Sequence, residues 1–233
     1  MSSSEFRAGM GREQRAASSL RARLLGQARL ELLRHGVDGA VPDQVTAAAG
    51  VPRGAFYRCF ASRESLLDAL VAEAVGANGA AVERALGVPE DPAVTVAALV
   101  RQTVRTTERD PLLACLAEAG RGVAEAATDD FSRRVLRSLS RGVWVGRFPV
   151  ASALVHLCAI RGAVLEVLRG RLHGLLPAAA EDELAAGALQ MLGLPAGEAA
   201  AIAAEPLAEV EPPPAPAYAA HGRGTPRPRL IPL

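Results

Sequence analysis

Four side chains at the end of the first quarter of the chain could together bind a polyanion. Arg53, Arg58 and Arg63 supply guanidinium groups, and Tyr57 supplies a phenol. A guanidinium group can donate in a fork to phosphate oxygens or to O6 and N7 of guanine, and a phenol can donate to phosphate. The types and close spacing of these residues therefore predict contact with nucleic acid.

Two short helices joined by a turn are needed to hold these side chains on one surface. The stretch from Pro42 to Arg63 has that pattern. Gly50 stands in its middle, where a residue without Cβ adopts positive φ at little cost, and Pro52 suits the first turn of a second helix. Phe56 and Phe60 give this second helix a buried side, because residues at this spacing share one face. The pattern predicts a helix-turn-helix whose second helix can enter the major groove of DNA.

The same stretch resembles the signature of TetR-type transcriptional regulators, A-G-V-S-x-G-x-[FL]-Y-x-[HY]-F-x-[SN]-[KR]-[ED]-x-L-[LF]. The residues that carry the resemblance are Ala49-Gly50-Val51, Arg53-Gly54, Phe56-Tyr57-Arg58, Phe60 and Ser62-Arg63-Glu64-Ser65-Leu66-Leu67. The similar part spans roughly residues 20–75. The resemblance implies an all-α fold, with an N-terminal three-helix helix-turn-helix DNA-binding domain and a C-terminal helical domain for ligand binding and dimerisation.

The helix-turn-helix supplies the candidate DNA contacts. Arg53, at the start of the second helix, could reach guanine, Gly54 lets the backbone approach the base edges, and Ala55 could touch a thymine methyl. The resemblance implies phosphate contacts for Tyr57 and Arg63. The full set of candidate DNA-binding residues is Asp43, Gln44, Arg53, Gly54, Ala55, Tyr57, Arg58, Cys59 and Arg63.

The chain departs from the family pattern around the first helix of the motif and at the end of the second. Val41 stands where Thr or Ser usually caps the helix and touches a phosphate, and Cys59 stands where His or Tyr is usual. Val45-Thr46 replaces the usual Ile-Ala pair. Asp38 or Asp43 could supply a weaker capping oxygen. These departures predict weaker phosphate contacts.

Composition and pattern divide the chain into four segments. Residues 1–17 are polar and basic and are expected to form a flexible arm that could add phosphate or minor-groove contacts. Residues 18–65 form the helix-turn-helix domain, and residues 66–205 form the helical effector-binding and dimerisation domain. Residues 206–233 hold 8 of the 16 prolines and are expected to be a disordered tail.

Apolar stripes at helical spacing, together with capping residues, set the expected helix limits. A first long helix should run from Ser18 or Ser19 to His35, and Ser62 or Ser65 should cap another that ends before Gly87. Further helices are expected from Asp91 or Thr95 to about 109, around 112–116, and at about 124–145, 150–172, 181–192 and 198–204.

Charge is divided unevenly along the chain. The formal net charge is +1, but residues 1–63 hold 10 Arg and 5 acidic residues, whereas residues 64–205 hold 13 Arg and 18 acidic residues. A basic head and an acidic body indicate that only the head meets a polyanion. Lysine is absent, which excludes a Walker-type phosphate loop and Schiff-base chemistry.

No catalytic residue, metal site or cofactor is indicated. The sequence lacks G-x-S-x-G and H-E-x-x-H, and His156 and Cys158 would lie on different faces of a helix. Together with Cys59 and Cys115, Cys158 suits a reducing cytosol rather than a disulfide framework. No secretory signal or membrane span is visible, so a soluble, cytoplasmic protein without a membrane partner is expected.

The helical body is expected to bind an unknown, apolar small-molecule effector and to form a homodimer. Aromatic residues with one convergent polar group suit such a pocket, and the candidates are Phe131, Trp144, Phe148, His156 and Arg161. The helices at 150–172 and 181–194 could pair with a second copy in a four-helix bundle. Candidate interface residues are Leu154, Leu157, Cys158, Leu165, Leu168, Leu184, Ala188 and Met191. Each of these residues could instead belong to an ordinary core.

The sequence therefore predicts a homodimeric regulator that binds double-stranded DNA at a near-palindromic operator, acts as a repressor and is released by an effector. Two alternatives remain open. One is a helical ligand-binding or interaction protein with weakened DNA binding, which Val41 and Cys59 favour. The other is a small-molecule enzyme in the helical body, which the missing catalytic residues disfavour.

Overall fold

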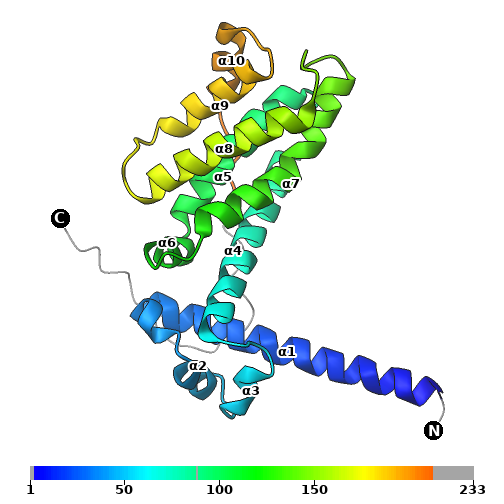
Figure 1. The fold of residues 1–233 in the computed structure, drawn as a ribbon, viewed down its shortest axis with the longest axis vertical. Coiled ribbons are helices and arrows are strands. Elements are labelled where there is room, and N and C mark those ends of the chain that lie inside the picture. Colours follow the sequence, from blue (N-terminus) through cyan, green and yellow to red (C-terminus); the bar gives the residue numbers. More distant parts are fainter. Residues whose placement is uncertain (1–2, 88, 212–233) are drawn as a thin grey trace. The chain divides into compact units, whose positions relative to one another are not determined.

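A computed structural model describes residues 3–87 and 89–211 of the chain, with side chains from Arg15 onward. These residues are helical throughout, apart from loops and one 3-10 turn, which confirms the predicted all-α class. The elements (Figure 1) are α1 (Ser3–His35), η1 (Val37–Gly39), α2 (Pro42–Ala48), α3 (Gly54–Tyr57), α4 (Arg63–Leu86), α5 (Pro92–Arg109), α6 (Pro111–Glu118), α7 (Val123–Trp144), α8 (Ala153–Leu172), α9 (Ala180–Met191) and α10 (Ala196–Ala203). The chain divides into two compact units, the first ending at Leu70 and the second beginning at Val71, both within α4.

The first unit is built around an apolar face of α1 and the rings that follow the turn. The inward-facing residues of α1 recur at helical spacing and are Leu24, Leu25, Ala28 and Leu32. The rings of Phe56 and Phe60 lie 5.6 Å apart, and both are buried. The Arg21 guanidinium lies 5.1 Å from the centre of the Phe60 ring, in cation–π contact. These contacts join α1 to the helix-turn-helix.

The turn between α2 and α3 depends on Gly50, as predicted. Its φ of 64° lies in the left-handed region, where a Cβ would be strained. The Val51 amide then donates to the Thr46 carbonyl at 3.0 Å and satisfies one of the last carbonyls of α2. The chain thus reverses within a few residues and can begin a second helix.

The second helix of the motif is shorter than the spacing of its aromatic residues predicts. Regular α-helix covers Gly54–Tyr57, and Arg53 already has helical φ and ψ before it. The Phe60 amide still donates to the Phe56 carbonyl at 2.9 Å, so one further turn positions the second ring. Both aromatic residues therefore reach the core although only one lies within α3.

Two serines cap α4 reciprocally. The Ser65 amide donates to Ser62 Oγ at 3.2 Å, and the Ser62 amide donates to Ser65 Oγ at 3.1 Å. This is the geometry of a capping box, with serine at the position where Glu or Gln is common. Both residues predicted as alternative caps therefore belong to one cap.

The second unit is organised around α5, which packs against α7, α8, α9 and α10 (Figure 1). The helix begins at Asp91, whose carboxylate accepts from the Ala93 amide at 2.8 Å, so the predicted cap is confirmed. The largest residues of the surrounding core include Leu99, Phe131, Leu139, Phe148, Ile160, Leu189 and Leu192.

Phe148 folds back onto α7 after that helix ends. Its side chain is buried, and a Cβ on Gly142 would lie 2.1 Å from its ring. Only glycine leaves room for the ring at this point of α7. The Phe148 amide also donates to the Gly142 carbonyl at 3.1 Å, so the return of the chain is fixed by both packing and a hydrogen bond.

The first helix begins earlier than predicted. It starts at Ser3 rather than at Ser18 or Ser19, so residues 3–17 of the segment predicted as a flexible arm are a continuation of α1. Residues 12–17 read R-E-Q-R-A-A, which are good helix formers, and no proline occurs before Pro42. Lengthening an existing helix needs no new nucleus, so the serines within it do not start one.

The C-terminal tail begins as a packed segment, contrary to the prediction from Pro206 onward. The buried Gln102 amide donates to the Ala208 carbonyl at 2.8 Å, and Val210 packs against the core. A buried amide needs a hydrogen-bond partner, and the tail backbone supplies it. The rest of the predicted tail, residues 212–233, lies outside the described residues.

Candidate DNA-binding surface and effector cavity

The surface of the helix-turn-helix carries most of the predicted DNA contacts. The Arg53 side chain is 65% exposed and Tyr57 is 52% exposed, and Arg58 is exposed as well. On α2, Asp43 and Gln44 are exposed. A Cβ on Gly54 would meet no atom within 4 Å. The start of α3 is therefore open to a large partner.

An ion pair joins the two helices of the motif at this surface. Arg53 Nε lies 3.1 Å from Asp43 Oδ1. A hydrogen bond with the Tyr57 side chain, followed by the charge of Asp43, raises the pKa of Arg53 above its usual range. Because both partners of the pair are well exposed, it stabilises the fold little. It does hold a permanently charged guanidinium beside Tyr57 at the start of α3.

Three of the predicted contacts are less exposed than Arg53, Tyr57 and Arg58. Ala55 is 2% exposed, so its methyl packs in the core and cannot touch thymine. Arg63 donates through Nε to the Ala40 carbonyl at 3.2 Å and through Nη2 to the Val37 carbonyl, which ties α4 to the loop before α2. Cys59 is only partly exposed. Spacing within a helix did not reveal these surroundings because they depend on neighbouring elements.

The first helix of the motif lacks a side-chain cap, as the sequence predicts. Val41 precedes α2 in an extended conformation and makes no cap hydrogen bond. Asp43, one of the expected substitutes, pairs with Arg53 instead. Thr46 is buried, and its hydroxyl donates to the Pro42 carbonyl at 2.8 Å, so this polar group is satisfied within α2.

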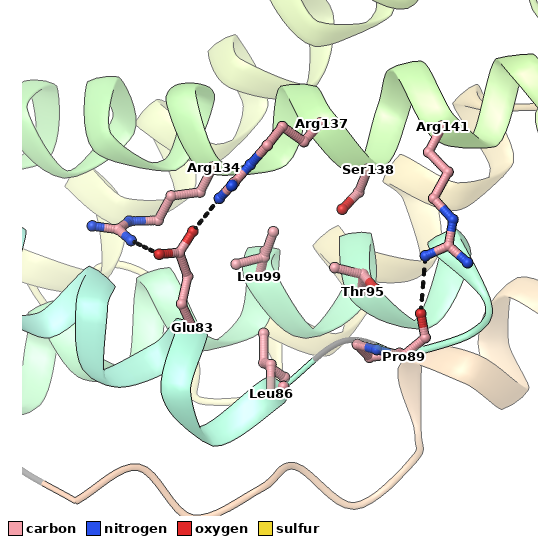
Figure 2. A pocket seen from close by; sticks show the side chains of 10 residues that line it. Glu83, Leu86, Pro89, Thr95, Leu99, Arg134, Arg137, Ser138 and Arg141 are labelled. Carbon is pink, nitrogen blue, oxygen red and sulfur yellow. Dashed lines mark hydrogen bonds and ion pairs between the residues drawn. The ribbon is translucent and has the colours of Figure 1, made fainter.

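A cavity of about 370 Å³ lies in the second unit, beside the last turn of α4. Its walls come from α4, the loop after it, α5 and α7 (Figure 2). The lining residues are Glu83, Leu86, Gly87, Pro89, Thr95, Leu99, Arg134, Arg137, Ser138 and Arg141. This volume falls at the small end of the range for small-molecule sites, so a compact ligand would fill it.

Glu83 is held between two arginines of α7 (Figure 2). Its Oε2 lies 2.5 Å from Arg134 Nη1, and its Oε1 lies 2.7 Å from Arg137 Nη2. Arg141 donates to the Pro89 carbonyl at 3.2 Å and to the Glu90 carbonyl at 2.7 Å. Three guanidinium groups and one carboxylate therefore form much of this wall, which is more polar than the apolar effector expected from the sequence would require.

Arg134 pairs on its other side with Asp130, one turn earlier in α7. Arg134 Nε lies 2.5 Å from Asp130 Oδ2, and the two side chains are 16% and 9% exposed. A Cβ on Gly79 of α4 would lie 2.1 Å from that carboxylate oxygen, so glycine allows the pair to approach α4. Arg134 thus bridges a buried carboxylate of its own helix to Glu83 of α4.

None of the five predicted effector residues lines this cavity. Phe131 and Phe148 are each 1% exposed and belong to the core, whereas Trp144 is 86% exposed. Arg161 pairs with an aspartate of α7 at 2.6 Å, and the ring of His156 contacts a carbonyl of its own helix cap at 2.9 Å. The prediction followed residue type, and rings that pack fully into a core leave no space for a ligand.

Sequence reasoning passed over the arginines that do line the cavity. Arg134, Arg137 and Arg141 recur at a spacing that places them on one face of α7. That spacing was a readable signal, but on most helices it marks a solvated face. The presence of Glu83 opposite them is a result of tertiary packing.

The predicted interface residues divide into exposed and buried groups. Leu154 is 61% exposed, Met191 is 39% exposed and Cys158 is exposed, whereas the partly exposed members are Leu157, Leu165 and Leu184. Leu168 and Ala188 are fully buried within the protomer, so they cannot contact a second copy. Val155, which the prediction omitted, is 65% exposed beside Leu154.

Among the described residues, α4 is the one helix whose length and mean hydropathy would allow it to cross a membrane. Half of the relevant window, 50%, is buried inside the protein, and core helices commonly meet the same criterion. In the same part of the chain, no group of three or more His, Cys, Asp and Glu side chains is arranged to hold a metal ion.

Two family models match the chain. The model described as bacterial regulatory proteins, tetR family, matches residues 24–70, which include the helix-turn-helix. The model described as tetracyclin repressor-like, C-terminal domain, matches residues 91–205, which include the cavity-lining parts of α5 and α7. No match was found among curated protein sequences.

Solved structures with the same architecture include RolR in complex with the ligand resorcinol. It is 27% identical over 85% of this chain and 100% of that chain, with a TM-score of 0.72. RolR without ligand is 28% identical over 82% and 100% of the two chains, with a TM-score of 0.69. The fatty acid degradation regulator FadR from Bacillus halodurans shares the fold, at 19% identity over 73% and 97% and a TM-score of 0.53.

Proposed function

Because the chain belongs to the TetR family of transcriptional regulators, we propose that it is a homodimeric repressor released from its operator by a small molecule. Regulators of this family bind DNA and are not enzymes. The operator is near-palindromic in this proposal, and the protein acts in the cytoplasm, where its DNA lies.

The observation that carries the proposal is the exposed cationic surface of the helix-turn-helix. Arg53 and Arg58 are exposed, and Tyr57 lies beside Arg53. An arginine at the start of the second helix suits a forked contact with guanine in the major groove, and the phenol suits a phosphate contact. Asp43 orients Arg53 in the absence of DNA rather than contacting the polyanion itself.

Exposed apolar side chains on α8 and α9 support the homodimer. Leu154 and Val155 are 61% and 65% exposed, and Met191 of α9 is 39% exposed. Covering such residues with a second copy would remove apolar surface from water, which favours association. A two-fold dimer places two copies of α3 on successive major grooves, and the operator must then share that symmetry.

The continuity of α4 supports release by a ligand. This one helix begins at Arg63, which holds the loop before α2, and reaches Glu83, which lines the cavity. A ligand that shifts the last turns of α4 would therefore move the helix-turn-helix. The ligand must favour the DNA-free state, and couplings of this kind are typically about 1–3 kcal/mol. The resorcinol-bound state of RolR, which is 27% identical, supports a small-molecule site in this chain.

The proposal is tested by DNA binding of the full chain to the fragment upstream of its own gene, at two salt concentrations. We expect specific binding that weakens as salt rises, because phosphate contacts release counterions. Arg53→Ala should reduce affinity roughly 10- to 100-fold. Arg133→Ala, which changes an exposed arginine of α7 that also pairs with an aspartate, should leave affinity unchanged. Equal losses in the two variants would exclude the assigned surface.

A second candidate function is a helical ligand-binding protein with weakened DNA binding. It is favoured by the missing side-chain cap at Val41 and by Arg63, which donates through Nε and Nη2 to backbone carbonyls. Both positions would otherwise supply phosphate contacts. Absence of specific binding to any fragment, with an intact fold by circular dichroism, would favour this candidate over the repressor.

A further inference from the structure

We propose that the cavity between α4, α5 and α7 takes a compact organic anion, with its oxyanion held by Arg137 and Arg141 and its apolar body on Leu86 and Leu99. The inference rests on the proposed function, in which this cavity is the effector site, and it names the chemical class of the effector. It replaces the apolar ligand that the sequence predicts.

The lining of the cavity carries more positive than negative charge. Arg134, Arg137 and Arg141 face a single carboxylate, Glu83, among the lining residues. Arg134 is neutralised further by the buried Asp130, which lies outside this lining. The surplus positive charge is therefore at the other end of the row, at Arg137 and Arg141.

The present partners of Arg137 and Arg141 leave both side chains available to an oxyanion. Within the described part of the chain, Arg137 has one ion pair, with Glu83, and its side chain is 79% exposed. The hydrogen bonds of Arg141 run to the Pro89 and Glu90 carbonyls, which are neutral acceptors. The Asp91 carboxylate is close enough for the charge of Arg141 to lower its pKa, but it forms its ion pair with Arg147. Guanidinium groups bind carboxylates more strongly than neutral oxygens, so an arriving oxyanion would form stronger bonds than those it replaces. An ammonium group would instead meet net repulsion.

The remaining wall sets the shape of the ligand. Leu99 is buried and Leu86 is partly buried, and they lie across the cavity from the arginines (Figure 2). The Ser138 side chain lies on α7 between Arg137 and Arg141 and adds a hydroxyl at the polar end (Figure 2). With a volume of about 370 Å³, the site suits one ring or a short chain that ends in an oxyanion.

Glu83 shares one arginine, Arg137, with the proposed ligand. Its carboxylate is bound by Arg134 and Arg137 and belongs to α4, so it ties α4 to α7. An oxyanion that binds Arg137 competes with this carboxylate for the same donors. Binding would therefore loosen the tie between α7 and the helix that continues into the helix-turn-helix.

The test uses calorimetric titration of the full chain with benzoate and hexanoate, each paired with its neutral amide. Benzylamine serves as the cationic probe. We expect at least one carboxylate to bind 10-fold or more tightly than its amide, and benzylamine not to bind. An amide that binds as tightly as its carboxylate, tighter binding of benzylamine, or no binding of either carboxylate at millimolar concentration would overturn the inference.

Three variants test the inference, because they should change carboxylate affinity in different directions, which a merely structural role would not produce. Arg137→Gln should weaken carboxylate binding about 10-fold, and Glu83→Gln should strengthen it several-fold because a competing negative charge is lost. Arg161→Gln, the matched exposed arginine outside the cavity, should change nothing. Weakening by Glu83→Gln in a variant with an unchanged melting temperature would contradict the competition.

The outcomes for the anion site and for the proposed function are separable. If a neutral amide binds and also releases the operator fragment, the proposed repressor function stands and the anion specificity is rejected. Carboxylate binding without any change in operator affinity would keep the anion site and reject ligand-driven release. Loss of operator binding in Arg53→Ala would assign the DNA site to the helix-turn-helix. Operator binding that no longer responds to benzoate in the cavity variants would separately assign the ligand site to the cavity.

Discussion

Arg53 and Arg58 of the first unit and Arg101 of the second have different surroundings. In the first unit, Arg53 is 65% exposed with one exposed partner, and Arg58 is exposed at the end of α3. In the second unit, the Arg101 side chain is 7% exposed and lies between Asp182 and the Glu205 carbonyl. Exposed arginines of the first kind are free to contact a ligand, whereas buried arginines of the second kind hold segments of the chain together.

The difference shows that charge balance and charge availability are separate properties. Residues 64–205 hold more arginines than residues 1–63, yet many of them are engaged in ion pairs between helices. Arg147, for example, pairs with Asp91 and Glu198, and Arg171 pairs with Glu108. A cationic surface for DNA is therefore defined by exposure and lack of strong partners rather than by the count of basic residues.

The largest effect is expected where the contrast between exposed and buried side chains is tested with two aromatic residues. Both belong to the second unit, and the sequence predicted both as effector-binding residues. Phe148→Ala should lower the free energy of unfolding by about 3–5 kcal/mol, because it leaves a hole in a core that is closed by Gly142. Trp144→Ala, at an exposed position, should change it by less than about 0.5 kcal/mol. Denaturant titration measures both. A large loss in the Trp144 variant would show that a partner covers this residue.

The next test replaces one arginine in each unit by glutamine. Arg101→Gln should destabilise the fold by about 1–3 kcal/mol, because Asp182 loses its partner and the Glu205 carbonyl loses a donor. Arg58→Gln should leave stability unchanged and weaken DNA binding instead. Chemical denaturation and fragment binding are measured on both variants. The comparison fails if the two variants lose the same property.

A smaller effect is expected at two glycines of the helix-turn-helix. Gly50→Ala should destabilise the protein by about 1–2 kcal/mol, because its φ of 64° is unfavourable for a residue with Cβ. Gly54→Ala should be neutral or slightly stabilising, since its added Cβ meets no atom and alanine favours helix. Thermal unfolding of both variants measures the difference. Equal melting temperatures would mean that the turn tolerates another backbone conformation.

The smallest effect concerns acid stability through Asp91 in the second unit. Burial raises the pKa of Asp91, but hydrogen bonds from Arg147 and the Ala93 amide, with nearby positive charges, outweigh it and lower the pKa overall. A lowered folded-state pKa contributes stability that is present above the unfolded value and is lost as pH falls through the folded value. Stability should therefore decline below about pH 4.

Asp91→Asn should reduce that decline because asparagine keeps a capping oxygen but does not titrate. Its stability at neutral pH should be slightly below that of the wild type. Urea unfolding at a series of pH values compares the two proteins. A steeper acid decline in Asp91→Asn than in the wild type would reverse the sign assigned to this group.

The sequence alone determined the fold class, the helix-turn-helix and the caps at Ser62 and Asp91, because these depend on contacts within a few positions. Gly50 at a left-handed turn, Asp91 at a cap and the paired aromatic residues around α3 are all readable from spacing. Local geometry of this kind requires no knowledge of the rest of the chain.

Only the tertiary structure decided which polar residues of the second unit line the cavity and which of its aromatic residues are buried. Glu83 and Arg137 are 54 positions apart and become partners only when α4 packs beside α7. Phe148 and Trp144 have similar composition signals, but the fold buries one and exposes the other. Burial and partnership between distant segments are properties of packing, so spacing within a helix cannot reveal them.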